Sequence, residues 1–172
     1  NTVINPVAIY IKLINASPTP FSGFYKVDDK YGICASPERY LKKEGNKIIS
    51  QPIKGTAKRS KNSAEDECNK TELRNSPKER SENVMVVDLV RNDLSRVCKQ
   101  GSVKVEELFG IYSFPQVHQM ISTIVGEVDD DVDWTDIVKH TFPMGSMTGA
   151  PKKRVMQLIE QYEKTKRGLF SG

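Results

Sequence analysis

The chain of 172 residues has few of the features that mark several protein classes. Its three cysteines, Cys34, Cys68 and Cys98, are widely spaced and form no C-x-x-C pair. This pattern argues against a zinc site and a disulfide framework, and it suits a reducing compartment. No apolar run approaches the ~18 residues of a membrane span, and the N-terminus lacks the basic and apolar regions of a signal peptide. We therefore expect a soluble, cytoplasmic protein without a membrane partner.

An excess of charge of one sign is also lacking. The chain has 26 basic and 22 acidic residues, a net charge of +4, and the two signs are mixed along most of its length. The basic clusters at 58–59 and 152–154 lack the interleaved aromatic side chains of a nucleic-acid surface. We expect no nucleic-acid partner, whereas a small anionic ligand explains local basic residues equally well. The length fits a single domain, residues 1–172, that can bury a sizeable core.

The local patterns predict a mixture of strands and helices. Two hairpins are expected, one over Phe21–Ala35 and one across the turn Glu44-Gly45-Asn46. The apolar run Val7–Ile14 fits either a strand or the end of a helix. Further elements are predicted at 63–75 (helix opened by Ser63), 77–97 (helix with Ser76 as N-cap and Pro77 first), 103–111 (edge strand), 134–141 (helix burying Trp134, Ile137 and Val138) and after Pro151 (helix with an apolar stripe of Val155, Leu158, Ile159 and Tyr162, closed by Gly168).

The stretch Gln51–Thr56 carries the first candidate for chemistry. Lys54 lies between a proline that fixes φ two residues earlier and a glycine, Gly55, that tolerates positive φ and close approach. A lysine aimed in this way is a candidate nucleophile. The second hairpin is expected to bring Glu38 and Lys54 to the same end of two adjacent strands. A carboxyl group beside a lysine is either an ordinary ion pair or an acid and nucleophile pair.

Glu79 and Glu82 are three residues apart on the helix that begins at Pro77, so both carboxylates lie on one face. Two like charges at this spacing repel each other unless a cation lies between them. Oxygen ligands suit Mg²⁺, which usually takes one or two carboxylates and keeps several waters. Glu-x-x-Glu is also common on solvated helices, so this pattern alone leaves a metal site and a solvated face both open.

The glycine-rich loop 142–152 precedes the last predicted helix. Its free backbone N–H groups near a helix N-terminus suit an anion, although such a loop can also merely turn a corner. His118 lies in the mixed apolar segment before it, and a lone histidine there is more often a packed core residue than a catalyst.

Four stretches, in this order, resemble the chorismate-utilising enzymes. They are SPERY at 36–40, PIKGT at 52–56, ERSENVMVVDLVRNDLSRV at 79–97 and FPMGSMTGAPKKRVMQLIE at 142–160. This family contains anthranilate synthase component I, aminodeoxychorismate synthase component I and the isochorismate and salicylate synthases. The resemblance implies an α+β fold in which antiparallel sheets pack together with helices outside.

Within the family, lysine at position 54 is typical of the aminodeoxychorismate synthases, whereas anthranilate synthases read P-I-A-G-T there. The resemblance therefore implies amination of chorismate at C4 to 4-amino-4-deoxychorismate, on the para-aminobenzoate branch of folate synthesis. Lys54 would add to C2 while the C4 hydroxyl leaves with a proton from Glu38, and ammonia would then attack C4 and expel the lysine. The ammonia would come from a glutamine amidotransferase partner.

The resemblance also implies roles for the other candidate residues. Glu79 and Glu82 would belong to a Mg²⁺ site that binds the ring carboxylate of the substrate. A dianionic substrate with a hydroxide leaving group needs a cation, oriented N–H groups and a proton donor, which agrees with these roles. The expected substrate-binding residues are Gly55, Thr56, Gln119, Gly145 and Ser146.

One position departs from the family pattern. Many relatives have a histidine in V-x-H before a valine-serine pair, and here Gln119 occupies that place while His118 lies one position earlier. Adjacent residues on a strand face opposite ways, so His118 does not inherit the histidine's role, and whether either residue acts in catalysis stays open.

Three rival functions are considered. Anthranilate synthase component I would release pyruvate and an aromatic amine, and an isochorismate synthase would use water as its nucleophile. A non-catalytic ligand-binding or subunit-interaction module is the rival from another class. The stretch 168–172 resembles the start of another strand, so we expect the chain to be a fragment of the catalytic domain that is incomplete as a catalyst.

Overall fold

The protein, described here by a computed structural model of residues 4–168, combines helices with antiparallel sheets. The helices are α1 (Pro6–Ala16), α2 (Ser63–Asn75), α3 (Pro77–Leu94), α4 (Trp134–Thr141), the 3₁₀ turn η1 (Gly145–Met147) and α5 (Lys152–Tyr162). The strands are β1 (Phe21–Val27), β2 (Lys30–Ser36), β3 (Arg39–Glu44), β4 (Lys47–Gln51), β5 (Ile53–Lys58), β6 (Lys104–Ser113) and β7 (Val117–Glu127). The predicted α+β class is confirmed.

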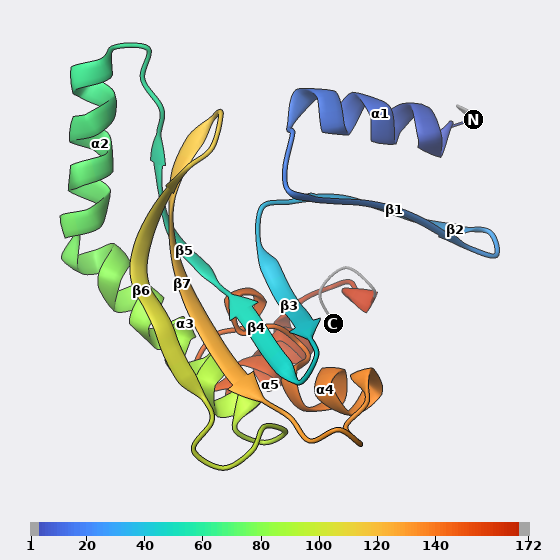
Figure 1. Cartoon of the computed structure of the whole chain (residues 1–172). Helices are drawn as coiled ribbons and strands as arrows, with labels where there is room; N and C mark the ends of the chain where they lie inside the picture. The colour runs from blue at the N-terminus through green and yellow to red at the C-terminus, as the bar shows by residue number, and fades with distance from the viewer. Residues whose placement is uncertain (1–3, 169–172) are drawn as a thin grey trace.

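Strand β7 is the centre of the larger sheet. It pairs with β4 and β5 along one edge and with β6 along the other, and β3 extends the sheet beyond β4. Residues 118–126 of β7 are all buried, because strands flank both edges and α2 and α3 pack on the sheet (Figure 1). The site described below is built on this strand, β5 and α3.

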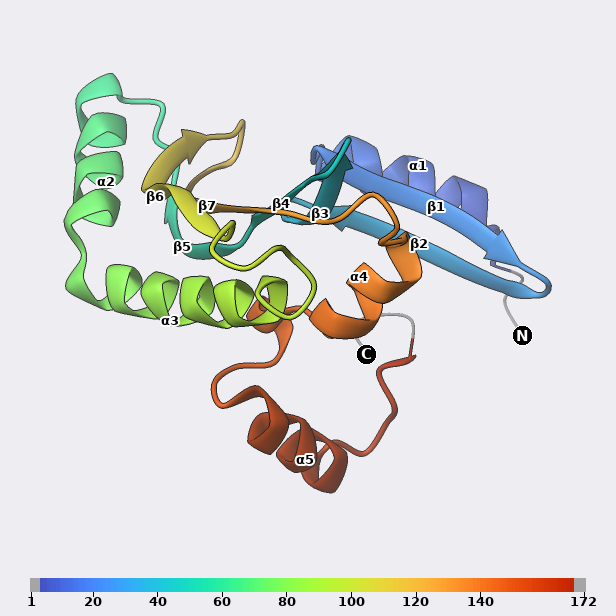
Figure 2. The same cartoon turned by 60° about the horizontal axis from the view of Figure 1, so that its bottom comes forward.

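Helix α3 lies across the sheet and supplies half of the core (Figure 2). The Glu79 N–H donates to the side chain of Ser76 at 3.3 Å, and Pro77 is the first helical residue, as predicted. The helix ends at Leu94 rather than near Val97. The core cluster contains Ile48, Val86, Val87, Val90, Leu94, Ile124, Val128 and Ile137.

The two predicted hairpins are confirmed, and the open segment 7–14 is helical. Helix α1 and the β1–β2 hairpin lie together beside the larger sheet, and α1 has no buried residue (Figure 1).

Figure 2 shows α5 set apart from α3 and the sheet, and its expected apolar stripe is at most half-buried, with Tyr162 73% exposed. Helix α5 ends at Tyr162, not at Gly168. The predicted strand start at 168–172 lies outside the described residues except for Gly168.

Two further helix predictions need correction. Helix α2 is capped by Asn62, whose side chain accepts from the N–H groups of residues 64 and 65, so Ser63 is its first residue instead of its cap. In α4 the buried residues are Ile137 and Thr141, one turn apart, while Trp134 and Val138 are 46% and 39% exposed. Only the face of α4 toward α3 is covered. Among residues 4–168, no helix combines the length and the apolar character needed to cross a bilayer.

Candidate active site

Lys54 lies in a break of the ladder between β5 and β7. Ile53 pairs with Ile121 and Thr56 pairs with Gln119, so three steps along β5 match two along β7. This is a β-bulge, which locally re-aims side chains and leaves backbone groups without ladder partners. Lys54 is half-buried and belongs to β5, whereas Glu38 directly precedes β3, and β4 and β7 lie between these two strands in the sheet. The prediction that Glu38 and Lys54 lie on two adjacent strands is therefore wrong.

Gly55 allows β5 to approach the first turn of α3. Its φ is +100°, and a Cβ at this position would lie 3.2 Å from both the Cβ and Oε2 of Glu79 and 3.2 Å from Cδ1 of Leu73. Only glycine combines this backbone conformation with such a close approach. The lysine stretch and the Glu-x-x-Glu pair, which are far apart in the sequence, are therefore in contact.

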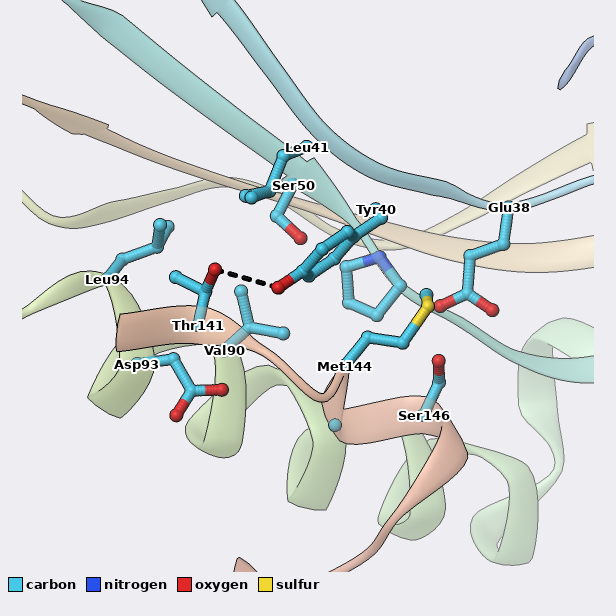
Figure 3. A pocket seen from close by; sticks show the side chains of 12 residues that line it. Glu38, Tyr40, Leu41, Ser50, Val90, Asp93, Leu94, Thr141, Met144 and Ser146 are labelled. Carbon is cyan, nitrogen blue, oxygen red and sulfur yellow. Dashed lines mark hydrogen bonds between the residues drawn. The ribbon is translucent and has the colours of Figure 1, made fainter. Parts of the chain in front are cut away.

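Glu38 precedes β3 and faces Ser146 across a narrow cavity (Figure 3). Burial raises the pKa of the Glu38 carboxyl, and the Ser146 hydroxyl, the Ile53 N–H and the charge of Lys54 only partly offset this effect. The Ser146 hydroxyl is buried and has no hydrogen-bond partner of good geometry among the described residues. A carboxyl group whose pKa is raised holds its proton to a higher pH than an exposed one, which suits a proton donor.

The cavity between Glu38 and α3 is small. Its volume is about 10 Å³, room for about one water, and Tyr40, Asp93, Thr141 and Met144 are among its lining residues. The Tyr40 hydroxyl shares a 2.8 Å hydrogen bond with Thr141, and burial raises the pKa of Tyr40 to about 12 (Figure 3). These groups line the cavity beside Glu38 with polar atoms.

The Glu79 and Glu82 carboxylates converge on one cation already present in the chain. Nζ of Lys78 lies 3.9 Å from an oxygen of each, and Lys78 itself is 77% exposed. Across residues 4–168 no three His, Cys, Asp or Glu side chains gather as a metal site. Two accessible carboxylates on one helix face fit Mg²⁺, which commonly takes one or two carboxylates and keeps waters in its remaining positions.

Gln119 and His118 face opposite sides of β7. His118 is 1% exposed, and its ring nitrogens lie 2.8 Å from Oγ of Ser113 and 3.1 Å from a carboxylate oxygen of Asp66. Gln119 is 7% exposed and lines a pocket of about 140 Å³ next to Pro37, the neighbour of Glu38. The Gln119 Oε1 atom is buried without a hydrogen-bond partner among the described residues. The His118 ring nitrogens are thus both hydrogen-bonded, one of them to α2, whereas the Gln119 Oε1 atom can accept a hydrogen bond from a ligand.

The loop after α4 brings Ser146 to Glu38. Gly145 is buried against Leu89 of α3, where an added Cβ would lie 3.2 Å from the Leu89 Cβ. The neighbouring Lys152 donates to a carboxylate oxygen of Asp93 at 2.7 Å and to the carbonyl of Thr141 at 2.8 Å. This ion pair joins the start of α5 to the end of α3. The expected anion site at the N-terminus of α5 stays a prediction.

The site therefore gathers most of the candidate residues. Lys54, Glu38 and Ser146 lie together, Gly55 touches Glu79, and Thr56 pairs with Gln119. Sequence reasoning missed three supporting residues: Asn83, Asp93 and Lys152. The sequence does mark Asn83 and Asp93, because both are polar residues at the helical spacing of the buried apolar positions of α3.

Comparison with known proteins places the whole chain in one family. The family model for chorismate binding enzymes matches residues 1–172. The chain is 43% identical over 169 residues to aminodeoxychorismate synthase component 1 of Bacillus subtilis (strain 168), which covers 98% of this chain and 36% of that protein. It is also 39% identical over 171 residues to anthranilate synthase alpha subunit 1, chloroplastic, of Arabidopsis thaliana, covering 99% of this chain and 29% of that protein.

A solved structure shares the fold. The crystal structure of anthranilate synthase component I from Streptococcus pneumoniae TIGR4 aligns with a TM-score of 0.85 and 32% identity, over 99% of this chain and 37% of that one. The chain thus spans about a third of the length of such relatives.

Proposed function

The chain belongs to the family of chorismate binding enzymes, and from this premise we propose that the protein aminates chorismate at C4 to give 4-amino-4-deoxychorismate. The observation that carries the proposal is the half-buried amine of Lys54 beside the carboxyl of Glu38, whose pKa is raised by burial. Residues 1–172 are assigned to the chorismate-binding catalytic domain.

Lys54 acts as the nucleophile and Glu38 as the general acid. The Lys54 amine, in its neutral form, bonds to C2 of chorismate, the ring double bonds shift, and the C4–O bond breaks. Glu38 gives its proton to the departing hydroxide, which leaves as water. Ammonia then bonds to C4 while the C2–N bond breaks, which returns the amine of Lys54, and the proton lost by the new C4 ammonium group restores the acid form of Glu38. The net change replaces the C4 hydroxyl with an amino group and keeps the enolpyruvyl group.

The remaining residues bind and orient the substrate. Thr56, Gln119 and Ser146 offer hydroxyl and amide groups to the reacting ring, and the buried side-chain oxygens of Gln119 and Ser146 have no partner within residues 4–168. Gly55 and Gly145 allow the backbone to approach closely. Glu79 and Glu82 would hold Mg²⁺, which when bound neutralises carboxylate charge on the substrate.

A partner and a pathway complete the proposal. Ammonia is supplied by a glutamine amidotransferase subunit or domain, in agreement with the designation "component 1" of a relative. The product feeds para-aminobenzoate and folate synthesis. A cytoplasmic location agrees with the three free cysteines, Cys34, Cys68 and Cys98.

Anthranilate synthase is the second candidate. It is favoured by the 0.85 TM-score to a solved anthranilate synthase component I and by an identity to one anthranilate synthase only four percentage points below the 43% quoted above. Overall similarity does not separate the two reactions. Lys54 does, because its amine occupies the place where anthranilate synthases have an alanine that cannot form a covalent bond.

The test is product identification with the full-length protein. Wild type and Lys54→Ala are incubated with chorismate, Mg²⁺ and ammonium, and products are identified by mass. Aminodeoxychorismate from wild type with a large loss in Lys54→Ala supports the proposal. Anthranilate or isochorismate from wild type contradicts it, and no turnover of chorismate at all supports a non-catalytic module.

A further inference from the structure

Asn83 is a buried polar residue to which the proposed reaction assigns no role. It lies on α3, one residue after Glu82, and is 1% exposed. Burying an amide costs free energy unless its hydrogen bonds are made, so the position of these bonds is informative.

The amide of Asn83 donates hydrogen bonds to backbone carbonyls of both β5 and β7 at the bulge. Its Nδ2 donates to the carbonyl of Lys54 at 3.3 Å and to the carbonyl of Met120 in β7 at 3.4 Å. The bulge removes these carbonyls from the regular ladder, and buried backbone groups need partners. One side chain of α3 therefore bridges the two strands where they do not bond to each other.

Ser122 fixes the orientation of this amide. Its hydroxyl donates to Oδ1 of Asn83 at 2.5 Å, and the Oγ atom of Ser122 in turn accepts from the N–H of Phe109 at 3.1 Å. The β6–β7 ladder is also irregular here, between Glu107 and Gly110. Asn83 and Ser122 thus hold irregular backbone in both strands that flank β7.

We infer that Asn83 is a positioning residue for Lys54: through the Lys54 carbonyl it fixes the backbone of the bulge from which the lysine side chain extends. The inference rests on the proposed function, because it assigns Lys54 the nucleophilic role. Asn83 also shares α3 with Glu79 and Glu82, so one helix sets both the lysine and the two carboxylates. A displacement of a catalytic group by about 1 Å can lower the rate by about 10²-fold, so a side chain that fixes the Lys54 backbone matters for catalysis.

The test compares a variant of the full-length protein that alters the Asn83 amide with two control variants. Asn83→Asp keeps the shape of the side chain and removes both donated hydrogen bonds. Asn69→Asp is the matched control, because Asn69 also donates from a helix to a carbonyl of β5, that of Lys58, at 3.1 Å. Val86→Ala, which removes two methyl groups from the core cluster on α3, controls for lost stability alone.

Turnover with chorismate, Mg²⁺ and ammonium gives kcat and the KM for chorismate. Incubation with chorismate and Mg²⁺ without ammonium gives the rate at which the protein gains a covalent adduct. For Asn83→Asp we expect kcat and the adduct rate to fall together by about 10²-fold while KM changes by less than about threefold. Both controls should keep wild-type kcat per folded molecule. If Asn83→Asp matches the controls, or if KM alone changes, the inference is wrong.

A second variant decides the matter should Asn83→Asp fail to fold. Ser122→Ala frees the Asn83 amide to turn, and it should lower kcat and the adduct rate together by about tenfold, less than the loss of the amide itself. Wild-type values for Ser122→Ala would overturn the inference. Failure of the wild type to form aminodeoxychorismate contradicts the proposed function instead, so the two failures are distinguishable.

Discussion

Replacement of Gly55 with alanine tests whether the lysine stretch and α3 are in contact as described. The substitution adds one Cβ atom at a residue with φ of +100°, where it would meet Glu79 and Leu73 at 3.2 Å. The backbone conformation and the close approach both oppose it. Glu79 is in addition a proposed Mg²⁺ ligand, so its displacement should weaken Mg²⁺ binding as well as lower the stability of the fold.

The expected loss in stability is the sum of two effects. A non-glycine residue held in a sparsely populated backbone region costs about 1–3 kcal/mol. Overpacking of a tight contact costs about 1–3 kcal/mol more. We expect Gly55→Ala to lower the free energy of unfolding by roughly 4 kcal/mol, near the middle of the summed range. Gly45→Ala is the matched control, because its φ is +57° and a Cβ there meets nothing within 4 Å, so it should lose only about 1–2 kcal/mol.

Urea unfolding followed by circular dichroism gives the free energies of both variants, and calorimetric titration gives the Mg²⁺ affinity of the folded proteins. Gly55→Ala should weaken Mg²⁺ binding, whereas Gly45→Ala should leave it unchanged. Equal stability losses in the two variants, or an unchanged Mg²⁺ affinity in Gly55→Ala, would refute the close approach of β5 to Glu79.

Two other changes test the groups around the cavity. Glu38→Gln removes the proposed proton donor and should lower kcat by about 10²–10⁴-fold. Because only the protonated carboxyl donates, the wild-type kcat should fall as pH rises through the raised pKa of Glu38. The pH–rate profile of Glu38→Gln should lack this decline. If the decline persists in Glu38→Gln, another group causes it. Lys152→Met leaves the buried charge of Asp93 unpaired and should cost about 3–5 kcal/mol in urea unfolding, most of it recovered in the double variant Asp93→Asn/Lys152→Met. A loss under about 1 kcal/mol, typical of an exposed pair, would contradict the burial of this ion pair.

Local signals in the sequence were sufficient for much of the fold. Ser76 and Pro77 define the start of α3 because a cap and a first-turn proline depend only on neighbouring residues. The two hairpins follow in the same way from their turn residues. Asn62 was missed as the cap of α2 because Ser63 beside it is an equally suitable residue type. The alternatives for 7–14 could not be separated, since a short apolar run has no distinguishing period.

Burial on the outer helices depends on neighbours that no local pattern reveals. Trp134 and Val138 have the right spacing for a buried stripe, yet α4 turns Ile137 and Thr141 toward the core instead. In α5 the apolar stripe is regular in the sequence, but nothing in residues 4–168 covers it fully. Amphipathic spacing predicts which face is apolar and not what packs on it.

The candidate site was predicted as residues but not as a geometry. The local pattern around Pro52 and Gly55 indicated Lys54, the expected hairpin indicated Glu38, and the family resemblance implied their roles. The opposite orientation of Gln119 and His118 followed from strand alternation. The bulge at Lys54 and the amide of Asn83 that fills it were not predictable, because both depend on a register between distant strands. A buried asparagine shows its purpose only when its partners are known.

The most direct test of the central claim is the mass of the full-length protein after incubation with chorismate and Mg²⁺ in the absence of ammonia. We expect a covalent adduct of chorismate less one water on the peptide that contains Lys54. The adduct should be absent from Lys54→Ala, and it should be lost on addition of ammonium as aminodeoxychorismate appears. Formation of aminodeoxychorismate by a Lys54→Ala protein at the wild-type rate, or an adduct on another residue, would contradict it.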